Sequence, residues 1–294
     1  MLTHRHATPS APSRVVVLGA GFIGAAAADA LADDGVAVER LGRRDVDLLA
    51  EGAGDALAAR LQADDVLVVV AAEAPCKNGA MLERNIRMMN AVVAALKARP
   101  VEHVVYVSSD AVYADFEGPL TEASCAEPGS LHGVMHLARE RMLLDEGGVP
   151  VGILRPTLVY GAADPHNGYG PNRFRRLAAE GREIVLFGEG EERRDHVLVD
   201  DLGELLRRMV GHRSTGVLNG ATGEVHSFRA IAEMVVGQIA GPPAIKGSPR
   251  AGAMPHNGYR PFDPAATFRA FPDFRYTRLS DGLALTHSRA AATA

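Results

Sequence analysis

The chain has 294 residues, with 31 Lys and Arg against 36 Asp and Glu, and 47% of its residues are hydrophobic. This balance is typical of a soluble globular protein and excludes a strongly basic surface, so we expect no nucleic-acid partner. The longest apolar run, 66–72, is too short to cross a bilayer, so we also expect no membrane partner. The two cysteines, Cys76 and Cys125, have neither metal-ligand nor disulfide-framework spacing, which favours a cytoplasmic protein.

Apolar runs alternate with helical patterns from residue 14 to residue 161, after a Ser-, Pro- and Thr-rich segment at 1–13 that we expect to be a disordered tail. Strands are predicted at 15–18, 36–41, 66–72, 103–108 and 151–154, and helices at 25–34, 54–62, 81–99 and 131–146. This alternation predicts a parallel sheet with helices on both faces. The fold class is therefore α/β, with a doubly wound parallel sheet.

The regular pattern breaks beyond residue 161, where Gly, Pro and Asn become frequent. Helices are still predicted at 172–180 and 200–210, and a strand at 183–187. We expect 162–287 to form mainly a smaller C-terminal substrate lobe over the carboxyl edge of the sheet, with segments that return to the sheet. The Ala-rich residues 288–294 are expected to be a flexible tail.

A glycine-rich loop, GAGFIG at residues 19–24, follows the first strand and opens the first helix. In this context glycines allow a tight turn, close approach of a pyrophosphate and close packing of helix on strand. The context favours a bound dinucleotide over a turn without a ligand. The expected cofactor contacts of the loop are Gly19, Gly21, Phe22, Ile23 and Gly24.

The end of the second strand bears on the choice between NADPH and NADH. An NAD enzyme usually places a carboxylate there on the ribose 2′-hydroxyl, whereas this chain has Arg43 and Arg44 after Gly42. Guanidinium groups offer paired donors to a 2′-phosphate, so NADPH is preferred, with a solvated turn as the alternative for the two arginines. Residues 14–161 are therefore predicted to be an NADP-binding Rossmann domain.

Seven segments along most of the chain carry a family resemblance, namely VVVLGAGFIG, VLVVVAA, Asn85 of LERNIRMMNAVV, VVYVSSDAVYAD, ILRPTLVYG, LFGEGEERRDHVLVDD and GVLNGAT. Together they resemble the extended short-chain dehydrogenases/reductases, which have the fold of NAD-dependent epimerases and dehydratases. LGRRDVDL is similar to the adenosine-contacting stretch of dehydrorhamnose reductases.

The resemblance implies a role for several single residues. Cofactor contacts are implied for Asp47 and Leu48 near the adenine, for Ala71 and Ala72 along the cofactor, and for Pro156, Thr157 and Leu158 on the nicotinamide side. Ser109 matches the serine that hydrogen-bonds the reacting carbonyl, and the adjacent Ser108 is the residue most easily confused with it. Arg193, Arg194 and Asp195 match a segment that often grips nucleotide-sugar phosphate, although salt bridges within the lobe are equally compatible with these arginines.

The resemblance breaks on the helix predicted at 131–146. The family's Tyr and Lys, four residues apart, should fall in PGSLHGVMHLARE, where this chain has His132 and His136. In the family the Tyr protonates the alkoxide as hydride arrives, and the Lys binds the nicotinamide ribose and lowers the Tyr pKa. The candidate catalytic residues are therefore Ser109, His132 and His136, and His136 is also a candidate for contact with the cofactor ribose.

Four interpretations of the histidine pair remain open. His132 could be the acid, since imidazole titrates near neutrality, but its reach is about 2 Å shorter than that of a Tyr. The pair could bind a metal ion, but the sequence shows no third ligand, so we expect no metal site. The chain could keep NADP as a structural ligand without chemistry. Finally, a ketone flanked by a phenolic hydroxyl could supply its own proton.

The fourth interpretation leads to our main hypothesis. Aromatic polyketides often carry such peri-hydroxy ketones, and the chain resembles atypical ketoreductases of angucyclinones, as in simocyclinone biosynthesis, that lack the Tyr and Lys. We expect an NADPH-dependent ketoreductase of antibiotic biosynthesis whose small-molecule ketone substrate protonates itself, acting as a homodimer or a monomer. The alternatives are a nucleotide-sugar epimerase or reductase that uses His132 as the acid-base group, and a non-catalytic NADP-binding protein.

Overall fold

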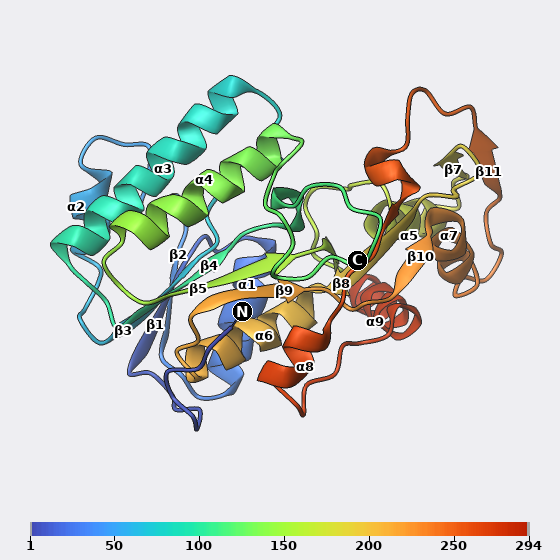
Figure 1. Ribbon diagram of the computed structural model, residues 1–294. Helices are drawn as coiled ribbons and strands as arrows, with labels where there is room; N and C mark the ends of the chain where they lie inside the picture. Colours follow the sequence, from blue (N-terminus) through green and yellow to red (C-terminus); the bar gives the residue numbers. More distant parts are fainter. Residues whose placement is uncertain (1, 293–294) are drawn as a thin grey trace.

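The computed structural model describes residues 2–292 and centres on a six-stranded parallel sheet (Figure 1). Its strands, in spatial order, are β2 (Val38–Leu41), β1 (Arg14–Leu18), β3 (Asp65–Val69), β4 (His103–Val107), β5 (Val151–Pro156) and β9 (Gly216–Gly220). The chain moves outward from β1 to β2 and then crosses to β3 on the other side of β1. The carboxyl ends of β1 and β3 thus form a topological switch point, where α/β sheets bind their ligands.

Helices cover both faces of this sheet (Figure 1). One face carries α1 (Phe22–Asp33) and α6 (Val199–Gly211), and the other carries α2 (Ala53–Ala58), α3 (Gly79–Ala98) and α4 (Leu131–Glu146). Successive residues of β1 alternate between the two cores, because neighbouring side chains of a strand point to opposite faces. Val15 and Val17 pack toward α1 and α6, and Val16 and Leu18 pack toward α3.

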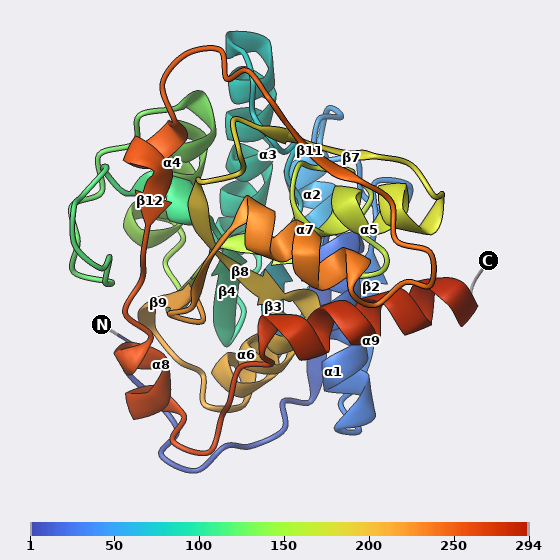
Figure 2. The ribbon, with the colours of Figure 1, turned by 90° about the vertical axis from the view of Figure 1, so that its right-hand side faces the viewer.

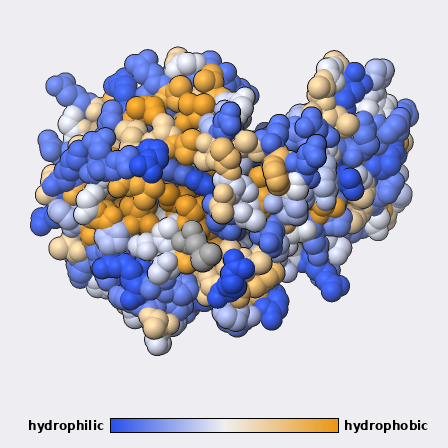
Figure 3. Space-filling model, in the orientation of Figure 1, coloured by the Kyte–Doolittle hydropathy of each residue, from blue (hydrophilic) through white to orange (hydrophobic). Residues whose placement is uncertain are grey.

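A smaller lobe stands beside the carboxyl edge of the sheet, at the right of Figure 1, and faces the viewer in Figure 2. Its elements are β6 (Leu158–Tyr160), α5 (Pro171–Ala179), β7 (Ile184–Phe187), β8 (Arg193–Leu198), β10 (Val225–Ser227), α7 (Phe228–Val236), β11 (Ile245–Ser248), β12 (Tyr259–Arg260) and α9 (Leu279–Ala292). Strand β8 pairs with β6, β10 and β12, and β7 pairs with β11. A notch separates the upper part of the lobe from the sheet domain in the space-filling view (Figure 3).

The predicted α/β class and doubly wound parallel sheet are confirmed. The helix predicted at 131–146 has these bounds in the structure, and that predicted at 81–99 spans Gly79–Ala98. The strand predicted at 66–72 ends earlier, at Val69, so Ala71 and Ala72 lie in the loop beyond it. Segments 199–211 and 216–220 leave the lobe and return to the sheet as α6 and β9. Short helix α8 (Ala265–Ala270) follows β12.

Residues 2–13 are ordered in the structure, which corrects the expectation of a disordered tail at 1–13; Met1 lies outside the described residues. The N–H and C=O of Thr3 both pair with Thr215, Ser10 N–H donates to the Gly211 carbonyl over 2.9 Å, and His4 Nδ1 lies 2.8 Å from Ser214 Oγ. Backbone pairing of this kind leaves no signal in the composition. At the other end α9 continues to Ala292, and residues 293–294 of the second expected tail lie outside the described residues. Among the helices of residues 2–292, none is long and apolar enough to cross a bilayer.

Candidate functional site

A cavity of about 400 Å³ lies at the switch point between β1 and β3. Seven of the residues predicted to contact the cofactor line it: Gly19, Gly21, Arg43, Asp47, Leu48, Ala71 and Ala72. Phe22, Ile23, Gly24, Arg44, His136, Pro156 and Leu158, also predicted, do not line it. The wall also contains residues that sequence reasoning missed, namely Leu18, Ala20, Leu41, Gly42, Val46, Leu49, Glu73 and Met88. Six of these eight residues are adjacent in the chain to a predicted residue that lines the cavity, so proximity in sequence could have identified them.

Two of the three glycines of the 19–24 loop, Gly19 and Gly24, are required by close approach of backbones. Gly19 has a φ of 104°, and a Cβ there would overlap the backbone of Ala71. A Cβ at Gly24 would overlap the carbonyl oxygen of Gly19. Gly21, by contrast, faces open space at the N-cap of α1, whose first turn holds no acidic residue and receives no side-chain cap. The first N–H groups of α1 are therefore free to bind an anion such as a pyrophosphate.

Arg43 and Arg44 differ in their relation to the cavity. Arg43 lies on its wall with its side chain 77% exposed, and its Nε donates to Asp47 Oδ2 over 3.3 Å. Asp47 also accepts the N–H of Leu49, and this bond first, then Arg43, lowers the pKa of Asp47. An exposed ion pair of this kind is weak, so the guanidinium can exchange Asp47 for a phosphate. Arg44 is exposed and lies off the cavity wall.

The start of α4 packs directly against the short 3₁₀ helix at Asp110–Val112. A Cβ at Gly133 would overlap the carbonyl oxygen of Ala111, so only glycine allows this approach. Ser109 caps the 3₁₀ helix by accepting the N–H of Ala111 over 3.1 Å. The contact brings the Ser109 turn next to His132, and the charge of Asp110 acts on that imidazole.

His132 and His136 lie edge to face on α4, with ring centroids 4.7 Å apart. The Nδ1 of His132 accepts the N–H of Cys76 over 3.4 Å, and the Nδ1 of His136 lies 2.8 Å from the hydroxyl of Tyr106. Burial lowers the pKa of both imidazoles, and in His136 the charges of His132 and Arg139 lower the pKa further. Both rings are therefore neutral at neutral pH. Because a backbone N–H can only donate, the bond from Cys76 assigns the remaining proton of His132 to Nε2.

The histidine pair does not have the surroundings of a metal site. Both Nδ1 atoms are engaged, and residues 2–292 contain no group of three His, Cys, Asp or Glu side chains arranged to hold a metal ion. Metal binding by these residues would also require a third ligand in the first coordination sphere.

The two serines at the end of β4 have different roles. Ser108 is buried and donates its hydroxyl to Glu140, which also forms a paired ion bridge with Arg155, at 2.9 and 2.5 Å. Ser109 is only half-buried, and apart from its capping bond it has one long contact of 3.4 Å with Asp110. Of the two, Ser109 is therefore the serine whose hydroxyl remains available to a ligand.

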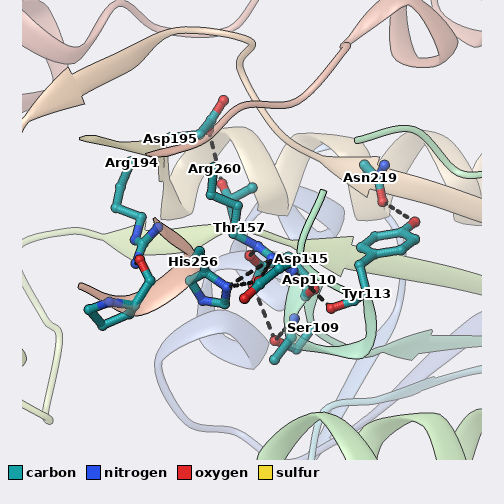
Figure 4. Close-up of polar contacts among 12 residues, drawn as sticks. Ser109, Asp110, Tyr113, Asp115, Thr157, Arg194, Asp195, Asn219, His256 and Arg260 are labelled. Carbon is teal, nitrogen blue, oxygen red and sulfur yellow. Dashed lines mark hydrogen bonds and ion pairs between the residues drawn. The ribbon is translucent and has the colours of Figure 1, made fainter. Parts of the chain in front are cut away.

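A charged cluster joins the Ser109 turn to the lobe (Figure 4). Arg260 donates to Asp110 and Asp115 over 3.2 and 2.9 Å, and His256 also bonds Asp115. Arg194 is buried, bridges Glu192 over 2.6 Å and donates to the carbonyl of Pro255.

The segment expected to bind phosphate, residues 193–195, thus makes its contacts within the lobe. Besides the contacts of Arg194, Arg193 stacks on the ring of Tyr259 at 4.3 Å. Asp195 accepts the Thr157 hydroxyl and the N–H groups of Thr222 and Gly223, and burial raises its pKa to about 6. These contacts match the salt-bridging alternative for the arginines.

Comparison with known proteins agrees with this geometry. The profile of the NAD dependent epimerase/dehydratase family matches residues 15–221. A UDP-glucose 4-epimerase of Mycolicibacterium smegmatis is 30% identical over 47% of this chain and 44% of its own length. A Bacillus subtilis protein described as an uncharacterized UDP-glucose epimerase is 24% identical over 43% and 41%. The chain thus matches less than half the length of these relatives.

Solved structures share the fold at lower identity. A UDP-glucose 4-epimerase from Thermotoga maritima, in a structure with UDP-glucose, superposes with a TM-score of 0.81 at 22% identity, over 95% of this chain and 99% of that one. A GDP-L-fucose synthetase from Naegleria fowleri bound to NADP gives 0.80 at 17% identity, over 98% and 97%. With the family profile covering most of its length, the chain belongs to the NAD dependent epimerase/dehydratase family.

Proposed function

We propose that the protein is an NADPH-dependent ketoreductase that reduces a carbonyl of an aromatic polyketide and leaves protonation of the product to the substrate. The observation that carries the proposal is the neutral histidine pair, with His136 buried and His132 half-buried, in place of the family's Tyr and Lys. A neutral imidazole whose remaining proton is on Nε2 can donate a hydrogen bond to a carbonyl. Because its pKa is low, the ring is rarely present as the imidazolium that would have to give a proton to the alkoxide.

The chain's own residues then have limited tasks. Ser109 and the Nε2–H of His132 orient the carbonyl, and the packed walls of the site exclude water. A peri-hydroxyl on the substrate supplies the proton and leaves a delocalised phenolate. The nicotinamide supplies the hydride when it is bound.

The cavity at the switch point fits a dinucleotide cofactor. The glycine cradle and the uncapped N-terminus of α1 would hold the pyrophosphate, and Asp47 and Leu48 would lie at the adenosine end. Arg43 favours NADPH, because its weak partner Asp47 can be exchanged for the 2′-phosphate.

Replacing Arg43 tests the choice of cofactor. The variant Arg43→Ala is expected to raise KM for NADPH roughly tenfold and to leave KM for NADH unchanged, since one charge-assisted contact contributes about 1–3 kcal/mol. Arg44→Ala is the matched control, because Arg44 lies outside the cavity wall. Equal changes with both cofactors would refute a role for Arg43 in binding the 2′-phosphate.

The proposed reaction is tested with a pair of ketones that differ only at the peri position. NADPH oxidation is measured with a peri-hydroxy quinonoid ketone and with its O-methyl ether. We expect the hydroxy ketone to be reduced and the ether to react at least about a hundredfold more slowly, because only the first carries a transferable proton. Equal rates would show that the protein supplies the proton.

A second function has support from the comparisons. The two curated relatives are described as UDP-glucose epimerases, and Asp110 lies close enough to raise the pKa of His132 against the effect of burial. In this case His132 would exchange a proton with a sugar hydroxyl. Incubation with UDP-glucose and NAD, followed by chromatography, would then reveal the 4-epimer without net cofactor turnover; no conversion rejects this candidate.

A further inference from the structure

A buried arginine, Arg139, lies on α4 one turn beyond His136. It is 0% exposed, and its Nη2 donates to the carbonyl of Ala71, on the wall of the cofactor cavity, over 2.6 Å. The remaining contacts are weak: Nη1 lies 3.5 Å from Asn85 Oδ1 and 3.8 Å from the sulfur of Met135, and Nε has no partner. The guanidinium is thus held by backbone and neutral groups.

The carboxylates nearest to Arg139 are committed to other cations. Glu140, the next residue, is bridged to Arg155, and Glu73, beyond Ala72, is bridged to Arg84. Within residues 2–292 no carboxylate lies within 4.0 Å of the Arg139 guanidinium. A buried cation without a counter-ion is unfavourable for folding, which suggests that it has another use.

A short chain of contacts connects this charge to the histidine pair. The Arg139 guanidinium lies over the ring of Tyr106, 5.3 Å from its centroid, and the Tyr106 hydroxyl lies 2.8 Å from His136 Nδ1. His136 in turn meets His132 edge to face. The groups that face the pair are Tyr106 from β4, Arg139 on α4, the Cys76 N–H and, at longer range, Asp110.

We propose that Arg139 is a positioning residue whose charge holds His136 in the neutral form. A proton added to His136 would place a second cation in the same low-dielectric environment, where like charges repel strongly. The same direction is seen in the lowered pKa of His136, to which Arg139 contributes after burial and His132. The inference deepens the proposed function, because it explains why His136 cannot act as the acid, but its test requires no substrate.

The test is a titration of the histidine ring signals by NMR in the full-length protein, assigned with single His132 and His136 variants. In the wild type we expect the pKa of His136 to lie well below the usual value near 6.5, because of burial and then of the charges of His132 and Arg139. Arg139→Met and Arg139→Gln remove the charge, and the second keeps a polar donor. Both are expected to raise the pKa of His136 above its wild-type value, while burial still holds it below 6.5.

Two controls separate charge from packing. Arg139→Lys keeps the charge and is expected to restore the wild-type titration, whereas Arg141→Met, on the exposed side of α4, is expected to change nothing. If the pKa of His136 in folded Arg139→Met or Arg139→Gln is no higher than in the wild type, or if Arg139→Lys fails to restore the wild-type pKa, the inference is wrong. If neither neutral variant folds, titration of His136 above pH 6 in the folded Lys variant or the wild type would refute it. Failure of the ketone assay alone would refute the proposed function and leave this inference intact.

Discussion

Helices α1 and α4 both begin at the carboxyl edge of the sheet, and their first turns form the two halves of the candidate site. The residues typical of the family are present at the start of α1 and absent at the start of α4. Both depend on a glycine that lets backbones touch: Gly24 at α1 against Gly19, and Gly133 at α4 against Ala111. At α1 the groups free to meet a ligand are backbone N–H groups. At α4 the candidate groups are the side chains of His132 and His136, at the positions where the family resemblance implies Tyr and Lys. A site built from backbone can thus persist while neighbouring chemistry changes.

We expect the largest effect from a substitution of Gly24, in the first turn of α1, where the backbone of Gly19 leaves no room for a Cβ. Gly24→Ala should abolish cofactor binding and lower the melting temperature, because the new Cβ overlaps the Gly19 carbonyl. Gly21→Ala is the matched control. Its Cβ meets open space, so stability should be unchanged while cofactor affinity, measured by fluorescence titration, falls through contact with the pyrophosphate. Normal cofactor binding by Gly24→Ala would contradict the account of this loop.

A smaller but still large loss of stability is expected when the buried ion pair between Arg155 and Glu140 of α4 is broken. Arg155→Met leaves Glu140 buried without its partner, and removing one member of a buried ion pair typically costs about 3–5 kcal/mol. Urea unfolding of the variant should show this loss. The exposed pair of Arg141 with Asp145 on the same helix offers the comparison, since Arg141→Met should change the free energy of unfolding by less than about 1 kcal/mol.

We expect acid to lower the stability of the folded protein, because the buried, neutral imidazole of His136 resists protonation. Burial lowers the pKa of His136 in the folded state below the unfolded value near 6.5, so the unfolded state binds the proton first. The stabilisation from the neutral ring is present above pH 6.5 and is lost as pH falls toward the folded pKa. Urea unfolding of His136→Gln should therefore show a smaller loss between neutral pH and about pH 5 than the wild type. His166→Gln, at an exposed position, should match the wild type.

The sequence was sufficient to predict five of the six strands of the sheet, the major helices and the glycine cradle, because hydrophobic periodicity and glycine spacing report directly on backbone geometry. The edge strand β9 (Gly216–Gly220) was not predicted. It identified the histidine pair but not what surrounds it. Tyr106 and Arg139 are 33 positions apart, and only the fold places the guanidinium over the ring. The position of Arg139, three residues after His136, was a signal that sequence reasoning could have used. The ordered N-terminal segment depends on backbone pairing and gave no such signal.

The central claim is that the pair at the α4 start does not supply the proton. It is tested most directly by the turnover of a peri-hydroxy ketone with NADPH in the double variant His132→Ala/His136→Ala, once cofactor binding and folding are verified. The account predicts kcat within about tenfold of the wild type, since only hydrogen-bonding orientation is lost. A fall of a hundredfold or more with cofactor affinity intact would show that a histidine is the acid and would contradict the claim.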